Sequence, residues 1–229
     1  MWTIVSDIIS YRMSEQILKL KEKLQKTGTR GLALDIDETL SFTNGYWIDA
    51  LLEKLPHPSL TKESILREYF YIERVPHWQT KEAYQLMVDF MHSNEFQKDI
   101  PLIENANHIV NRINKKIPIV AYITARPEVV RKGTEFWLRK HGFPKADIIL
   151  KPHAVPFERK NEWKAEVVQR LHPEIIGIVD DNPGLADALS GDYQGTLYLY
   201  DNIKHPRKDI RVVPCKTWND VASAIHRAE

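Results

Sequence analysis

Two aspartates separated by a single residue stand at the end of a short apolar run. Asp35 and Asp37 close the run at residues 31–36, and Thr39 follows two positions later. In such a pair one carboxylate can attack an electrophilic atom such as phosphorus. The other can protonate the leaving oxygen and later deprotonate a water molecule. We therefore expect Asp35 to be a nucleophile and Asp37 a general acid and base.

Further polar residues follow the later apolar runs. Thr124 ends the run at residues 117–124, and Asp180 and Asp181 follow the run at residues 175–179. Lys164 lies early in the helix-period stretch that precedes this last run. A hydroxyl and an ammonium group can hold phosphoryl oxygens and neutralise charge in the transition state. We expect Thr124 and Lys164 to bind the phosphate.

The acids at these strand ends raise an electrostatic problem. Unpaired carboxylates that meet at one sheet edge repel one another, and some of them stay protonated. A hard divalent cation with oxygen ligands removes this repulsion, and Mg²⁺ in particular keeps several waters and partners a phosphate. The sequence therefore predicts a Mg²⁺ site beside Asp35.

Apolar runs alternate with helix-period stretches along the chain. The runs lie at residues 31–36, 117–124, 147–150, 175–179 and 195–200. The helical stretches lie at residues 102–115, 127–141, 158–171, 183–190 and 217–227. Strands that are apolar on both faces and alternate with helices indicate a parallel sheet covered on both sides. We expect an α/β, doubly wound parallel sheet, and a Pro127 at the first position of its helix.

The segment before the first strand has a helical stripe. Met13, Ile17, Leu20 and Leu24 recur at helical spacing over residues 12–26, and Gly28 follows. We expect this stripe to pack on the core, with a seam against a second copy as the alternative. Oligomeric state is left open.

One interval in the alternation is far too long for a simple crossover. About eighty residues separate the runs at 31–36 and 117–124, where a strand–helix–strand unit needs about thirty. We expect residues 1–42 and 101–229 to form the core, with residues 1–28 as an N-terminal helical segment. Residues 43–100 form a helical cap inserted after the first strand, with helices near 64–74 and 81–92. Its position above the sheet edge is that of a lid over a ligand.

These motifs closely resemble those of the haloacid dehalogenase-like (HAD) superfamily. The DxDxT motif matches Asp35, Asp37 and Thr39, the strand-terminal threonine matches Thr124, and the acidic pair matches Asp180 and Asp181. The resemblance runs from about residue 30 to the end of the chain. It implies a Rossmann-like core with a cap of the C1 type, inserted after the first strand.

The resemblance also implies a mechanism. It implies an aspartyl-phosphate intermediate on Asp35, with Asp37 as general acid and base. It implies Mg²⁺ held by the Asp35 side chain, the Asp37 backbone carbonyl and Asp180, with Asp181 assisting. In this superfamily an acid at the position of Asp37 goes with phosphatases, so hydrolysis is favoured.

Several assignments stay open. Lys164 is the preferred phosphate-site lysine, with Lys151 and Lys160 as alternatives. Arg126 either binds substrate or pairs with a nearby acid, and we expect Glu38 to point outward from its loop.

Composition limits the class of protein. The chain has 229 residues, 32 Lys and Arg against 31 Asp and Glu, and a single cysteine. This balance gives no general attraction to nucleic acid, although a phosphorylated end can still fit a local groove. One cysteine excludes an internal disulfide, and no run reaches the ~18 apolar residues of a membrane span. With no secretory signal, we expect a cytoplasmic location.

We therefore expect a Mg²⁺-dependent phosphomonoesterase that acts on a small phosphorylated metabolite, with a nucleotide as the leading candidate. The alternatives on the same residues are a phosphotransferase or mutase and a phosphatase of nucleic-acid ends. A catalytically inactive phosphate-binding or interaction protein is the alternative of another class.

Overall fold

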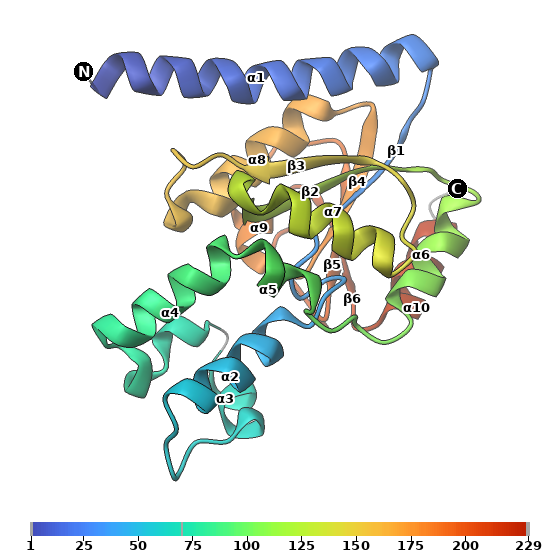
Figure 1. The fold of residues 1–229 in the computed structure, drawn as a ribbon. Coiled ribbons are helices and arrows are strands. Elements are labelled where there is room, and N and C mark those ends of the chain that lie inside the picture. Colours follow the sequence, from blue (N-terminus) through green and yellow to red (C-terminus); the bar gives the residue numbers. More distant parts are fainter. Residues whose placement is uncertain (1, 70, 228–229) are drawn as a thin grey trace.

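The computed structural model describes the backbone of residues 2–69 and 71–227 and the side chains of residues 15–69 and 71–227. The chain folds around a six-stranded sheet, with helices on both sides and a helical insertion at one end (Figure 1). No helix of this described part is both long and apolar enough to cross a bilayer.

All neighbouring strands of the sheet are parallel. The strand order is β3-β2-β1-β4-β5-β6. The strands are β1 (Gly31–Leu34), β2 (Ile119–Pro127), β3 (Asp147–Lys151), β4 (Ile175–Asp180), β5 (Thr196–Tyr200) and β6 (Arg211–Cys215). The chain moves outward from β1 to β3 and then returns to β4, so the topology reverses between β1 and β4. Open α/β sheets bind ligands at this reversal. The predicted doubly wound fold is confirmed.

Helices from different parts of the chain cover the two faces. The core helices are α1 (Trp2–Thr27), α6 (Ala106–Asn114), α7 (Arg131–Lys140), α8 (Lys160–Leu171), α9 (Pro183–Ala188) and α10 (Trp218–His226). Helices α1, α8 and α9 pack in one apolar cluster, and α6, α7 and α10 pack in the other. Along β1, Ala33 faces the first cluster while Leu32 and Leu34 face the second, which is the period of two that a strand imposes.

Two details of the core differ from the sequence prediction. Strand β6 was not expected, because its sequence contains Pro214 and begins with a charged residue; as the last strand of the sheet order it is an edge, where proline is tolerated. Strand β2 runs on to Pro127, so this proline ends a strand and does not begin a helix. A 3₁₀ turn, Glu128–Val130, follows it, and α7 begins at Arg131.

Within residues 43–100, the described part of the chain forms the helices α2 (Thr43–Lys54), α3 (Lys62–Glu68), α4 (Lys81–His92) and α5 (Asn94–Lys98). Helices α2 to α4 share an apolar cluster of their own, centred on the buried Trp78 and Ile48. Helix α2 was not among the helices predicted from the sequence. The sequence also predicted one helix over 64–74, where the structure has α3 and then a 3₁₀ turn, Ile72–Arg74.

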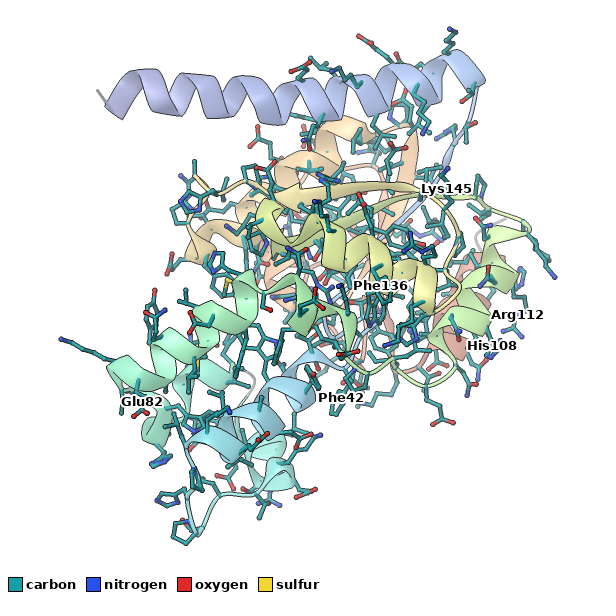
Figure 2. All side chains as sticks on the ribbon, viewed as in Figure 1. Phe42, Glu82, His108, Arg112, Phe136 and Lys145 are labelled. Carbon is teal, nitrogen blue, oxygen red and sulfur yellow. The ribbon has the colours of Figure 1, made fainter. Side chains whose placement is uncertain are left out.

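The cap is joined to the core through two linkers that lie side by side. Ser41 pairs with Leu102 in an antiparallel bridge, and the Phe42 amide donates to the Pro101 carbonyl at 2.8 Å. Figure 2 labels Phe42 at this junction. Helix α5 is fixed to α7, because the Asn94 side chain accepts from the Gly133 amide at 2.7 Å. The insertion thus leaves and re-enters the core at one place.

Helix α1 lies along the side of the core that faces away from α2 to α4 (Figure 1). Three residues of its predicted stripe, Ile17, Leu20 and Leu24, are buried in the first cluster. The fourth, Met13, lies outside the described side chains. The C-terminal half of α1 therefore packs on the core, as predicted.

Two leucines of this helix make a matched test. Leu20 is 4% exposed and Leu18 is 54% exposed. We expect Leu20→Ala to lower the free energy of unfolding by about 2–5 kcal/mol, through lost apolar burial and the cavity that it leaves. Leu18→Ala is expected to change it by less than about 0.5 kcal/mol. Urea unfolding measures both, and equal losses would contradict the packing of α1.

Candidate functional site

The first two acids of the site stand on neighbouring strands at the topological reversal. Asp35 directly follows β1, and its amide donates to the Val179 carbonyl of β4 at 2.9 Å. Asp180 is the last residue of β4. Because parallel strands end at the same edge, the two carboxyl groups meet there. Both residues are buried, with 5% of Asp35 and none of Asp180 exposed.

A buried lysine joins these two carboxylates. Lys164 Nζ, from the first half of α8, lies 2.9 Å from Asp35 Oδ1 and 2.7 Å from Asp180 Oδ2. Burial lowers the pKa of Lys164, but the charges of Asp180 and Asp35 outweigh this effect and raise it above its ordinary value. Lys164 is therefore a fixed cation between the two acids.

The two alternative lysines lie elsewhere. Lys151 Nζ donates to the Val155 carbonyl at 2.6 Å, in the loop after β3. Lys160 lies one turn before Lys164 and, like Lys164, lines the cavity between core and insertion that is described below. Its Nζ lies 3.9 Å from the centroid of the Phe157 ring. Of the three candidates, the structure brings Lys164 into contact with the acids.

Asp181 is held beside this pair by Thr39. The Asp181 amide donates to Thr39 Oγ1 at 3.1 Å, and Thr39 Oγ1 lies 3.2 Å from Asp181 Oδ1. Carboxylate oxygens of Asp35, Asp180 and Asp181 all lie within 4.8 Å of one another. Thr39 is itself anchored, because its carbonyl accepts from Trp218 Nε1 at 2.9 Å.

The charges of this cluster do not balance. Three carboxyl groups face one lysine, and burial raises the pKa of Asp35 to about 7, opposed by the charge of Lys164 and reinforced by that of Asp180. Burial, and then the charges of Asp180 and Asp35, raise the pKa of Asp181 well above its usual value. A group of hard oxygen donors with excess negative charge fits a divalent cation.

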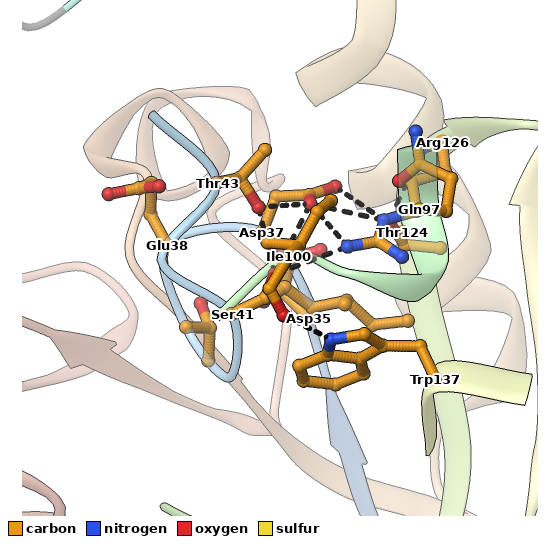
Figure 3. Close-up of polar contacts among 12 residues, drawn as sticks. Asp35, Asp37, Glu38, Ser41, Thr43, Gln97, Ile100, Thr124, Arg126 and Trp137 are labelled. Carbon is orange, nitrogen blue, oxygen red and sulfur yellow. Dashed lines mark hydrogen bonds and ion pairs between the residues drawn. The ribbon is translucent and has the colours of Figure 1, made fainter. Parts of the chain in front are cut away.

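Asp37 is held apart from the cluster by a different cation. Arg126 is the second-last residue of β2. It contacts the Asp37 carboxylate through Nε at 3.1 Å and Nη2 at 2.7 Å (Figure 3). Burial raises the pKa of Asp37, but the Arg126 charge and hydrogen bonds from Arg126 and Thr43 outweigh it, so the pKa is lowered. Of the two roles left open for Arg126, the structure shows the ion pair with an acid.

Thr124 lies within β2, three residues before its end, because the strand runs on beyond the predicted residues 117–124 to Pro127. It is fully buried, and its hydroxyl accepts from the Arg126 amide at 3.3 Å. The residues that line the cavity at this point are its neighbours Ala125 and Arg126.

The expectation for Glu38 is wrong. Its side chain does not point outward: it lines the cavity, and Oε1 accepts from the Asn44 amide at 2.6 Å. Burial raises the pKa of this carboxyl to about 7. The reason is the backbone, since Glu38 has a left-handed φ of 58° that turns its side chain back toward the cap. The sequence carries no signal for this turn, because no glycine or asparagine marks it.

Above the acids lies a cavity of about 710 Å³ between core and cap. Its floor carries Asp35, Asp37 and Lys164. Apolar and aromatic cap residues line the upper part, among them Trp47, Tyr71, Tyr84, Met87 and Met91. This volume is in the range of small-molecule sites, which combine an apolar lining with a few polar groups.

Comparison with known proteins agrees with this arrangement. Over 87% of its length the chain superposes on 96% of a HAD family hydrolase from Deinococcus radiodurans R1, solved with bound phosphate and sodium, with a TM-score of 0.54 and 16% identity. The chain has the HAD-superfamily fold. The resemblance expected from the DxDxT motif is thus confirmed at the level of the fold, and the acids described above lie at the edge of the sheet where the parallel strands β1 and β4 end.

Two sequence comparisons cover parts of this HAD-fold chain. Residues 84–179 match the family model described as PITM 1-3, LNS2 domain. Over 161 residues the chain is 27% identical to the Oceanobacillus iheyensis protein named "Putative nucleotidase OB0422". That alignment covers 68% of this chain and 79% of the relative.

The two buried lysines, Lys164 and Lys151, provide a test of the cluster's electrostatics. Lys164→Met leaves Asp35 and Asp180 without a counter-charge, so the folded-state pKa of Asp35 rises further above the unfolded value. The variant then loses stability as pH rises through that interval. We expect a loss of about 3–5 kcal/mol at pH 8 and a smaller one at pH 5. Urea unfolding at both pH values measures this.

Lys151→Met is the matched control. It removes a lysine that is 6% exposed but donates to carbonyl groups, so its cost is expected to be about 1–3 kcal/mol and independent of pH. The same pH dependence in both variants would contradict the ion pairs assigned to Lys164.

Proposed function

We propose that this protein is a Mg²⁺-dependent phosphomonoesterase in which Asp35 is the nucleophile. The observation that carries the proposal is the contact of Lys164 with both Asp35 and Asp180, beside Asp181, on the floor of a cavity roofed by the cap. A carboxylate suited to nucleophilic attack, a fixed cation and excess carboxylate oxygens lie within one small volume, and phosphoryl transfer requires such a combination.

The first half-reaction forms a phosphoaspartate. A carboxylate oxygen of Asp35 attacks phosphorus, and the bond between phosphorus and the ester oxygen breaks. Because the Arg126 contact lowers the pKa of Asp37, this carboxylate first accepts the proton of the bound phosphate monoester and then gives it to the leaving oxygen, so the product departs as a neutral alcohol. Lys164 neutralises charge on the phosphoryl oxygens as they approach the cluster, and the Thr124 hydroxyl is proposed to donate a hydrogen bond to one of them.

The second half-reaction restores the enzyme. Asp37, now ionised, takes a proton from a water molecule, and the water oxygen attacks phosphorus. The bond between phosphorus and Asp35 breaks, inorganic phosphate leaves with the proton that Asp37 took from water, and both carboxyl groups are ionised again. The cap excludes bulk water from this exchange and selects the leaving group.

Asp35, Asp180 and Asp181 are the residues that would hold Mg²⁺ with their side chains, together with the backbone carbonyl of Asp37. The ion, when bound, supplies charge neutralisation between the nucleophile and the phosphate oxygens. The fit rests on the donor set: the buried carboxyl groups of Asp35 and Asp180 and the half-buried one of Asp181, two of the three with raised pKa values, face one lysine.

A small phosphorylated metabolite suits the cavity, and a nucleotide is the leading candidate. Two observations support it: the aromatic lining of the cap, and the 27% identity to a protein named as a nucleotidase. Aromatic rings offer faces on which a base can stack.

Phosphate release from a panel of phosphomonoesters tests the reaction. With Mg²⁺ we expect release that EDTA abolishes and that Asp35→Asn lowers by at least about 10⁴-fold, because the nucleophile is lost. Asp192→Asn, an exposed acid outside the site, is the matched control and should keep full activity. Release that survives Asp35→Asn would show that another group attacks phosphorus.

Cation binding should depend on pH. Mg²⁺ needs ionised ligands, and Asp35, with a pKa of about 7, loses its proton only as pH rises through neutrality. From the protonation of Asp35 alone, we expect the affinity for Mg²⁺, measured by calorimetry, to be about tenfold weaker at pH 6 than at pH 8. Asp180→Asn should weaken binding at both values. An affinity that does not change with pH would contradict the raised pKa values of the cluster.

A further inference from the structure

Arg126 is buried more deeply than the acid that it pairs with. Its side chain is 3% exposed, whereas that of Asp37 is 30% exposed. Its guanidinium carbon lies 5.8 Å from the centroid of the Trp137 ring, and Trp137 Nε1 donates to the Ile100 carbonyl at 2.7 Å. Arg126 therefore backs Asp37 from the protein side, while the carboxylate keeps access to the cavity.

This arrangement is not one that stability alone favours. Nη1 of Arg126 is buried and has no hydrogen-bond partner within the described part of the chain. A buried donor without a partner costs free energy, and apolar residues of similar volume often replace buried ion pairs without loss. The geometry of the pair thus points to a function at Asp37.

The contacts treat the two oxygens of Asp37 differently. Oδ1 accepts from Arg126 Nη2 at 2.7 Å, from Arg126 Nε at 3.1 Å and from Thr43 Oγ1 at 2.6 Å, and Ser41 Oγ lies 3.4 Å away. Oδ2 accepts only from Arg126 Nε, at 3.1 Å, among the described residues. The first oxygen is anchored, and the second keeps a lone pair available for a proton.

The same contacts connect Asp37 to both linkers of the cap (Figure 3). Ser41 and Thr43 belong to the outgoing linker and the start of α2. Ile100 belongs to the returning linker. Its carbonyl accepts a hydrogen bond from Trp137, and the guanidinium group of Arg126 lies over the Trp137 ring. The orientation of the Asp37 carboxylate is therefore fixed at the place where the cap joins the core.

We infer that Arg126 is a positioning residue that holds Asp37 with Oδ2 directed to the leaving oxygen of the substrate. The inference rests on the proposed phosphomonoesterase function. In the step concerned, the proton moves from Oδ2 to the ester oxygen as its bond to phosphorus breaks, and Arg126 itself neither gains nor loses a proton. Its removal leaves the acid present but no longer directed at that oxygen.

A pair of substrates with leaving groups of similar size separates this role from a structural one. The 4-nitrophenolate ion departs without a proton, whereas the alkoxide of benzyl phosphate must be protonated. We expect Arg126→Met to lower kcat/KM for benzyl phosphate by about 10²-fold or more, and for 4-nitrophenyl phosphate by less than about tenfold. The constant kcat/KM reports the steps up to release of the alcohol, so the hydrolysis of phosphoaspartate does not enter the comparison.

The ratio of the two constants is measured on one sample, so a partly unfolded variant lowers both values and leaves the ratio unchanged. Asp37→Asn should shift the ratio in the same direction, and the double variant should be no worse than Asp37→Asn alone. Arg126→Lys, which keeps the charge but loses the two-nitrogen contact, should fall between wild type and Arg126→Met. Arg139→Met, an exposed arginine on the same helix as Trp137, is the control and should leave the ratio unchanged.

Two failures are distinguishable. A wild-type protein that cleaves neither ester would overturn the proposed function and this inference with it. An active wild type whose two constants fall equally in Arg126→Met, or a double variant much worse than Asp37→Asn, would overturn the role of Arg126 alone.

Discussion

The contact of Lys164 with Asp35 and Asp180 is the interaction on which the site depends. It joins the end of β1 to the end of β4 across the point where the sheet topology reverses, and it brings α8 to the same place. Two buried carboxylates so close together are tolerable only because a buried cation lies between them. Asp181 adds a third acid that this lysine cannot balance, and the remaining negative charge suits a divalent cation.

Much of the fold was predictable, because the sequences of buried parallel strands are continuous apolar runs. Five of the six strands and the order of alternation followed from that pattern. Strand β6 did not, since an edge strand is only partly buried and its Pro214 breaks the pattern. Helix α2 was missed because its apolar residues pack within the cap, on partners that local periodicity cannot reveal.

The placement of the acids at the sheet edge followed from the topology, but their pairing did not. Topology predicts that strand ends converge, so Asp35 and Asp180 were expected together. Which of the three candidate lysines joins them did not follow: Lys160 and Lys164 differ in the turn of α8 that they occupy, and Lys151 lies at the end of β3. The ion pair of Arg126 with Asp37, and the inward turn of Glu38, depend on side-chain and backbone torsions that a single sequence does not encode visibly.

The adjacent linkers of the cap have a consequence for how such a protein can change. Since residues 41 and 102 are already bridged, a short turn there would close the core without the inserted segment. The chain therefore leaves the core for the insertion and returns from it at one place, and a different segment can be accommodated there without altering the order of the strands. In this architecture the inserted segment can therefore change in evolution while the acids at the ends of the core strands are kept. Thr43, the first residue of α2, limits this freedom. It is part of the insertion, but its hydroxyl donates a hydrogen bond to the Asp37 carboxylate of the core.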